Sequence, residues 1–184
     1  MIPTSRRISH AFSASFVVLV RPLYPENVGA VARAMRVMGF ENLILVAPHR
    51  LAEPTHEQAR KMAVGSVDIL ERAQIVDSLD RVSAQVDLRV ATSARRRISG
   101  ILSPRELGIR LAQPAQAKRI AWIFGSERTG LKKSEMETCE VVCRIPMAGN
   151  EPSMNLSQAV MIVLYEVFTA CLAQGPDTER ATKS

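Results

Sequence analysis

The sequence predicts an α/β fold, in which a parallel β-sheet is flanked by helices within one domain. Short continuous apolar runs, such as residues 16–20, are typical of strands that are buried on both faces of a sheet. These runs alternate with helical patterns, and a strand, a helix and a second strand follow one another between residues 16 and 47. Such a unit implies parallel strands joined by a right-handed crossover. The 184 residues suffice for one domain with a substantial core.

The chain begins with residues 1–15, which contain no acidic residue and no apolar periodicity, and which we expect to form a disordered basic arm. After the first strand comes a loop with two prolines, and Asn27 is placed to cap the helix that follows. Gly39 should end that helix. The strands are expected at residues 16–20, 42–47, 74–76, 86–91, 119–124 and 140–145. The helices before the last strand are expected at residues 28–38, 55–63, 78–85, 104–112 and 134–139.

A long apolar helix closes the domain, which we place at residues 16–175, before a polar tail at residues 176–184. Asn155 and Gln158 have the spacing of an N-cap and its capping-box partner, and so predict where this helix begins. Its apolar residues leave only a narrow polar strip, so the helix should be buried on more than one side. In a chain of this length, that pattern predicts a subunit interface.

The composition narrows the class of protein. A net charge of +6 favours a polyanionic partner. No run of eighteen apolar residues occurs, so a membrane span is not expected. The three cysteines lack metal-ligand spacing and predict buried, reduced thiols in a cytoplasmic protein. The three histidines lie apart from the candidate site loops and no nucleophile-elbow motif occurs, which argues against a metal site and against a hydrolase.

Three loops that directly follow predicted strands contain glycine and polar residues, at residues 92–97, 125–131 and 145–155. In an open parallel sheet such loops share one edge, so segments that are distant in sequence can form one pocket. Any single loop would be an ordinary turn, but the three together favour a ligand site. The sequence lacks the Gly-x-Gly-x-x-Gly fingerprint and the Walker loop, which argues against ordinary dinucleotide and nucleoside triphosphate sites.

The start of the first helix is a second candidate site. The small side chains around Gly29 allow another backbone or a phosphate to approach closely, and Arg33 lies one turn further on. A solvated helix face would carry the same residues. Glu127 is either a salt-bridge partner in its loop or a site carboxylate, and the sequence leaves both open. The cluster at residues 95–97 is placed to hold phosphates, although such clusters also occur on solvated surfaces.

Three motifs together resemble the signatures of the SPOUT superfamily of RNA 2′-O-ribose methyltransferases, in its TrmH group. A fourth segment, at residues 92–95, is most similar to the TrmJ branch, whose members methylate the ribose at position 32 of tRNA. The three motifs are Asn27-x-Gly29-Ala30-x-x-Arg33-Ala34, Phe124-Gly125-x-Glu127-x-x-Gly130-Leu131, and Ile145-Pro146-Met147 leading to Ser153-Met154-Asn155-Leu156-Ser157.

The resemblance implies a SPOUT fold with a C-terminal trefoil knot, which binds S-adenosyl-L-methionine, acts on RNA as a homodimer and contains no metal. General topology rules argue against knots, so that expectation comes from the family alone. The residues implied to bind the cofactor are Thr92, Ser93, Ala94, Gly125, Ile145, Ser153, Met154 and Asn155. The residues implied to surround the reacting ribose are Asn27, Arg33, Glu127, Ser153 and Asn155. Contacts with RNA are expected from Arg33, Arg36, Arg95, Arg96 and Arg97.

The implied reaction is transfer of a methyl group to a ribose 2′-hydroxyl, with tRNA as the expected substrate. Members of the TrmJ branch carry an additional C-terminal helical region where this chain has a polar tail, so an rRNA ribose stays open as an alternative. A non-catalytic RNA-binding protein of the same fold is a further alternative, against which the complete motifs count. A guanidinium stays protonated at neutral pH, so Arg33 suits charge stabilisation better than proton removal. Substrate phosphate, water and Glu127 remain open as the proton acceptor.

Overall fold

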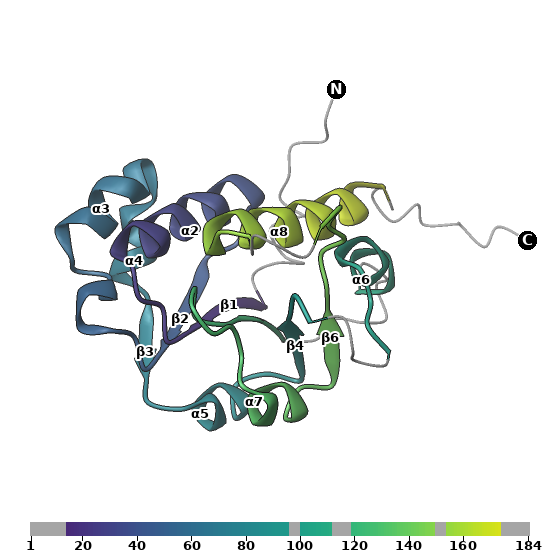
Figure 1. Cartoon of the computed structure of the whole chain (residues 1–184). Coiled ribbons are helices and arrows are strands. Elements are labelled where there is room, and N and C mark those ends of the chain that lie inside the picture. Colours follow the sequence, from purple (N-terminus) through teal and green to yellow (C-terminus); the bar gives the residue numbers. More distant parts are fainter. Residues whose placement is uncertain (1–13, 96–99, 112–118, 150–153, 174–184) are drawn as a thin grey trace, which may run out of the picture.

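A six-stranded sheet forms the centre of the computed structural model, which describes residues 14–95, 100–111, 119–149 and 154–173 (Figure 1). All neighbouring strands are parallel, in the order β3-β2-β1-β5-β4-β6. The predicted α/β class is confirmed, and all six strands lie where they were expected, with the last one shorter. The strands are β1 (Ser15–Val20), β2 (Asn42–Val46), β3 (Gln74–Val76), β4 (Leu88–Thr92), β5 (Ile120–Phe124) and β6 (Val141–Cys143).

Helices cover both faces of the sheet (Figure 1). Side chains of β1 alternate between the two faces: Val17 and Leu19 pack in the larger core cluster, and Val18 and Val20 pack in the smaller one. The continuous apolar run is therefore explained by burial on both sides. The larger cluster lies under α2 (Pro25–Met38), α3 (Glu57–Ala63), α4 (Val67–Glu71), α6 (Pro104–Leu111) and α8 (Leu156–Ala173). The smaller cluster lies against α5 (Leu79–Ser83) and α7 (Lys133–Glu137), and two short 3-10 helices, η1 (Arg50–Ala52) and η2 (Val64–Ser66), complete the chain path.

Helix α2 begins three residues earlier than predicted, so the prediction that Asn27 caps it is wrong. Tyr24 occupies the N-cap position, and Pro25 starts the helix because its fixed φ suits the first turn and its missing N–H is not needed there. Asn27 consequently lies within the first turn, with its side chain available for contacts elsewhere. Gly39 ends the helix in the left-handed conformation, with φ of 81°, as predicted.

The small residue at position 29 allows two helices to approach each other. A Cβ atom built on Gly29 would lie 2.1 Å from the carbonyl oxygen of Ala59 in α3, so only glycine permits this α2–α3 contact. Of the alternatives that the sequence left open here, the close approach of another backbone is the one observed. The short helix α4 was not predicted, because it is held by the burial of Ile69 and Leu70 and not by a local signal.

Helix α8 runs beside α2 and α6 on the same face of the sheet (Figure 1). It buries Val160, Val163 and Leu164 completely, yet only 28% of its residues are buried. By length and composition alone it could cross a membrane, with a mean hydropathy of 1.7, but core helices of soluble proteins pass the same test. Much of its apolar surface therefore remains uncovered within one copy of the chain.

Candidate functional site

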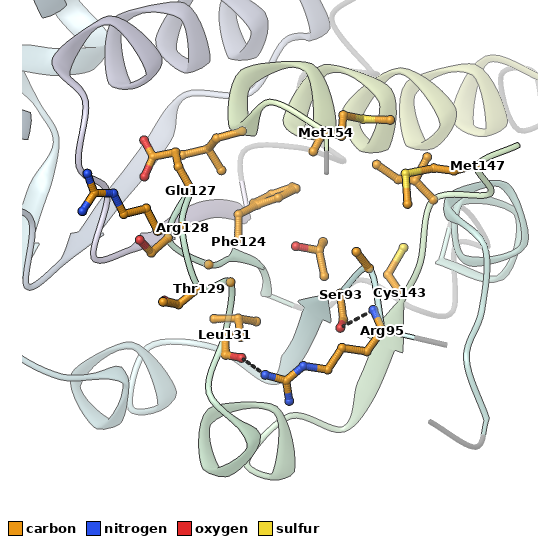
Figure 2. Close-up of a pocket in the computed structure, with 18 residues that line it drawn as sticks. Ser93, Arg95, Phe124, Glu127, Arg128, Thr129, Leu131, Cys143, Met147 and Met154 are labelled. Carbon is orange, nitrogen blue, oxygen red and sulfur yellow. Dashed lines mark hydrogen bonds between the residues drawn. The ribbon is translucent and has the colours of Figure 1, made fainter. Parts of the chain in front are cut away.

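A pocket of about 280 Å³ lies at the carboxyl edge of the sheet, where β4, β5 and β6 end (Figure 2). This volume is close to the lower end of the range for ligand pockets, roughly 300–1,000 Å³. All three loops that the sequence singled out contribute side chains to it, as the sheet-edge argument predicted. Its apolar wall comes from Leu131, Cys143, Ile145, Met147, Met154 and Leu156, and its polar groups come from Ser93, Ser126, Glu127 and Arg128.

Six of the eight residues that the resemblance assigns to the cofactor line this pocket. Asn155 follows one lining residue directly, at the start of α8. Ser153 lies outside the described residues. The six lining residues are Thr92, Ser93, Ala94, Gly125, Ile145 and Met154.

The loop at residues 125–131 folds back on itself as a tight turn. The backbone N–H of Gly130 donates to the carbonyl of Ser126 at 2.8 Å. A Cβ atom on Gly125 would lie 2.1 Å from the carbonyl carbon of Gly130, so the turn requires glycine at position 125. The guanidinium of Arg95 donates to the carbonyl of Leu131 at 3.3 Å, which ties this loop to the one after β4 (Figure 2).

An ion pair between Arg21 and Glu135 holds the segment that follows the loop at residues 125–131. Arg21 directly follows β1 and adopts the left-handed conformation, with φ of 52°, which is rare for a residue other than glycine. Its guanidinium donates to both carboxylate oxygens of Glu135, and a third bond from Lys132 N–H to that carboxylate measures 2.7 Å. Burial raises the pKa of Glu135, but these hydrogen bonds outweigh burial and the net shift is downward. Neither residue was predicted, because the contact spans 114 positions and leaves no local pattern.

Three side chains at the mouth of the pocket form a continuous hydrogen-bonded chain. The Glu127 carboxylate accepts from the backbone N–H of Leu23 at 3.0 Å, from that of Tyr24 at 3.4 Å, and from Asn27 Nδ2 at 2.9 Å. Asn27 Oδ1 in turn accepts from Asn155 Nδ2 at 3.0 Å. The chain joins the loop after β5, the start of α2 and the start of α8, and all three sequence motifs therefore meet at one place.

The direction of each bond in this chain is fixed by its neighbour. A carboxylate only accepts, so Glu127 turns the Asn27 amide nitrogen toward itself, and the Asn27 oxygen must then face Asn155. The remaining Asn155 oxygen accepts from the backbone N–H of Ser157 at 2.9 Å and of Gln158 at 3.4 Å, which caps α8. The predicted capping role of Asn155 is confirmed, and both amides are oriented by the contacts around them.

The arginines assigned to RNA differ in their surroundings. Arg33 is exposed on α2, and within the described part of the chain it forms no hydrogen bond or ion pair. Arg36 instead binds both oxygens of Asp68 on α4, and the Asp68 hydrogen bond raises the pKa of Arg36. Arg36 therefore serves a contact between helices. Arg96 and Arg97 lie outside the described residues.

The cysteines are unpaired, and burial raises the pKa of Cys143 to about 12. Cys143 lines the pocket as a neutral thiol. Among the described residues, no group of three or more His, Cys, Asp or Glu side chains has an arrangement that could hold a metal ion.

The fold and the site define an α/β domain that takes a small molecule at the carboxyl edge of a parallel sheet, beside a cluster of polar side chains open to a larger partner. More specifically, the chain belongs to the SpoU rRNA methylase family, which matches residues 14–165. The resemblance read from the motifs is thereby confirmed.

Known relatives carry more specific names. The chain is 39% identical over 168 residues to the tRNA (cytidine/uridine-2′-O-)-methyltransferase TrmJ of Photorhabdus laumondii, covering 90% of this chain and 68% of that protein. It is 42% identical over 158 residues to the TrmJ protein of Pectobacterium atrosepticum, covering 85% of this chain and 64% of that protein. This chain thus spans about two thirds of the length of these relatives.

Solved structures of similar proteins share the fold. A probable methylase family protein from Haemophilus influenzae matches with a TM-score of 0.83 and 32% identity, over 94% of this chain and 72% of that one. An rRNA methyltransferase from Sinorhizobium meliloti, solved with S-adenosylmethionine bound, matches with a TM-score of 0.68 and 25% identity, over 83% of this chain and 55% of that one.

Proposed function

We propose that this protein is an S-adenosyl-L-methionine-dependent RNA methyltransferase that transfers a methyl group to a ribose 2′-hydroxyl, with tRNA as its substrate. The observation that carries the proposal is the convergence of all three family motifs, which place Glu127, Asn27 and Asn155 in one hydrogen-bonded chain at the mouth of the pocket. The names of the similar TrmJ proteins support tRNA over other RNAs.

The pocket suits the proposed cofactor chemically. Its wall combines aliphatic and sulfur-containing side chains, against which a purine ring packs, with hydroxyl and backbone groups that recognise the polar ends of a nucleoside. When bound, S-adenosyl-L-methionine supplies an activated methyl group on a sulfonium. The residues proposed to hold it are Thr92, Ser93, Ala94, Gly125, Ile145, Ser153, Met154 and Asn155.

The protein contributes mainly alignment, because methyl transfer is an in-line displacement whose two reactants must be held in register. Asn27 and Asn155 each use one amide hydrogen within the chain described above, and each keeps a second one. We propose that these two N–H donors bind the ribose oxygens and favour negative charge on the attacking oxygen. Such preoriented donors stabilise developing charge without reorganising during the reaction.

Arg33 and Glu127 have separate proposed roles. The exposed guanidinium of Arg33 holds the phosphate next to the target ribose or stabilises the developing oxyanion. Glu127 already accepts three N–H donors, so we propose that it positions Asn27 and is not the proton acceptor. Water or a substrate phosphate then takes the proton.

The C-terminal trefoil knot, the cytoplasmic location and the homodimer belong to the same proposal. A shallow groove between α2 and α8 supports a dimer, since it is lined by Ala30, Ala34, Met154, Ser157, Gln158, Met161 and Ile162 and is almost wholly apolar. Tyr165 adds a side chain that is 51% exposed on α8. A second copy would bury these groups, and sedimentation at micromolar concentration should detect a dimer.

Ribosomal RNA is the second candidate substrate, because the matching family and two of the similar solved structures are named for rRNA. The decisive experiment is incubation of the protein with labelled S-adenosyl-L-methionine and separated tRNA and rRNA, followed by nucleoside analysis. A 2′-O-methylnucleoside in tRNA is the expected product. The same product in rRNA alone would select the second candidate, and a methylated base or no product from any RNA would refute the proposal.

A further inference from the structure

Four cations lie on three neighbouring loops at the carboxyl edge of the sheet, and two of them, Arg95 and Arg128, line the pocket. Arg95 follows β4, Arg128 and Lys132 follow β5, and Arg144 follows β6. Arg95, Arg128 and Lys132 are exposed, and Arg144 is half-buried. Among the described residues, none of the four forms an ion pair with a carboxylate. We call these four residues the basic rim.

Among the described residues, the acids of these loops form no ion pair with a rim arginine, although the charge of Lys132 acts on Glu135 and helps to lower its pKa. The Glu127 carboxylate faces inward to Asn27 and the loop before α2, and Glu135 is bound by Arg21. Two rim arginines also tie adjacent loops together through carbonyl groups: Arg144 donates to Ala94 at 3.3 Å, and Arg95 donates to Leu131. A carbonyl oxygen carries no net charge, so these bonds fix the positions of the two guanidiniums and leave their charge uncompensated.

The opposite edge of the sheet shows the reverse arrangement. Arg89, at the start of β4, binds Glu140, and Arg119, just before β5, binds Asp87. Arginines at the amino ends of these strands are thus paired with acids, whereas those at the carboxyl ends are not. Among the described residues at the ends of β4 and β5, the arginines that no carboxylate binds therefore lie at the pocket edge of the sheet.

We propose that the basic rim binds the sugar-phosphate backbone of the substrate RNA beside the nucleotide that enters the pocket. This inference rests on the proposed function and extends it to a surface. Arg128 lies at the edge of the pocket, but its guanidinium points away from the pocket centre (Figure 2). The guanidinium forms no hydrogen bond or ion pair within the described residues, so its donors are available to a phosphate. Lys132 stands at the start of α7, an element that packs on the smaller core cluster, on the other face of the sheet from α2.

The position of the rim defines a path for the RNA. Arg33 lies on α2, over one face of the sheet, and Lys132 lies toward the other face, with the mouth of the pocket between them. An RNA strand that contacts both must cross the carboxyl edge of the sheet from the α2 side to the α7 side. The target ribose then lies at the crossing point, next to Asn27 and Asn155.

The test uses Arg128→Ala and Lys132→Ala, singly and together, in the full chain. Methylation of tRNA is measured from 50 to 300 mM salt, with cofactor affinity measured separately by calorimetry. Each removed phosphate contact should lower the slope of log affinity against log salt by about 0.7–0.9, so the double variant should lose about 1.5. The KM for tRNA should rise several-fold relative to wild type at 50 mM salt and approach the wild-type value as salt increases, while the affinity for S-adenosyl-L-methionine stays unchanged.

Arg119→Ala is the matched control, since it removes one positive charge from the other end of β5. The control should leave the salt slope within about 0.2 of wild type, because its charge is already paired. If the double variant and wild type have the same slope of log affinity against log salt, the proposal that the basic rim binds RNA is refuted, even if wild type methylates tRNA. If the double variant changes only the affinity for S-adenosyl-L-methionine, the rim cations bind the cofactor and not the RNA, and the proposal is also refuted. Failure of the proposed function has a different signature, in which wild type methylates no RNA.

Discussion

Replacing Glu127 with glutamine tests whether this carboxylate positions its neighbours or takes part in the chemistry. The change keeps the size of the side chain but turns one acceptor oxygen into an N–H donor. Oε2 accepts from Leu23, and Oε1 accepts from Tyr24 and Asn27. Whichever way the new amide turns, at least one of these three N–H groups will face another donor.

The cost follows from the number of bonds that are changed. A hydrogen bond to a charged group contributes about 1.5–3 kcal/mol, against about 0.5–1.5 kcal/mol for a neutral pair. Loss of one such bond and weakening of the other two should therefore destabilise the protein by about 2–3 kcal/mol. For a chain of this size, that corresponds to a fall in Tm of roughly 4–12 °C. The misplaced Asn27 and Asn155 amides should also lower kcat by roughly 100-fold, since small misalignments are costly in displacement reactions.

Thermal unfolding, calorimetry with S-adenosyl-L-methionine and a methylation assay across pH test these expectations together. The variant should show a lower Tm, a reduced kcat and a pH-rate profile of unchanged shape. Glu137→Gln is the control, because within the described residues this exposed carboxylate on α7 pairs only with Lys133, at 3.6 Å, and should change stability by less than about 0.5 kcal/mol. A Glu127→Gln protein that unfolds at the wild-type temperature yet lacks activity, with the acidic limb of its pH profile lost, would refute the positioning role.

Three further predictions concern the same site. Gly125→Ala should abolish cofactor binding in calorimetry, because its Cβ would overlap the backbone of its own loop at 2.1 Å, whereas Gly65→Ala, with no atom within 4 Å of its Cβ, should bind normally. Arg33→Ala should lower methylation by at least roughly 100-fold and leave cofactor affinity unchanged, and retained turnover would exclude Arg33 from the mechanism. Glu135→Gln should lower stability at pH 7 by about 1–2 kcal/mol through its lost bonds to Arg21. Because the pKa of Glu135 is lowered in the folded protein, its contribution is complete above its ordinary value of 4.5 and is lost as pH falls through the folded pKa, so urea titrations should show wild type and variant converging in acid.

The strands and the long helices were predictable because their signals are local. β1 and β5 are apolar without interruption, since both faces of each strand are covered, and Gly39 ends α2 through its own backbone conformation. The start of α2 was misplaced for a related reason. Both Pro25 and Asn27 are favourable helix-start residues, and local propensity alone did not indicate which one begins the helix.

The contacts that build the site could not be predicted from local sequence signals, because they join residues that are distant in sequence. Asn27 meets Glu127 across 100 positions and Asn155 across 128. Arg36, which was expected to contact RNA, binds Asp68 on a helix that was not predicted, and its RNA contact stays a prediction. No pattern within a window of ten residues can specify such pairs. What the sequence did contain was the joint occurrence of three short motifs, each ordinary when taken alone.

That joint occurrence has a physical basis in the orientation of the amides. Asn27 can present a free N–H at the pocket mouth only if an acceptor-only group holds its other N–H and a donor holds its oxygen. Glu127 meets the first requirement and Asn155 meets the second, while Asn155 is itself held by the helix that it caps. A change at any one of the three residues would alter the orientation of the side chains of the other two. The sequence must therefore contain all three residues together. The motifs can therefore be read as the three parts of one hydrogen-bonded unit, which explains why their combination identifies the site when none of them does so singly.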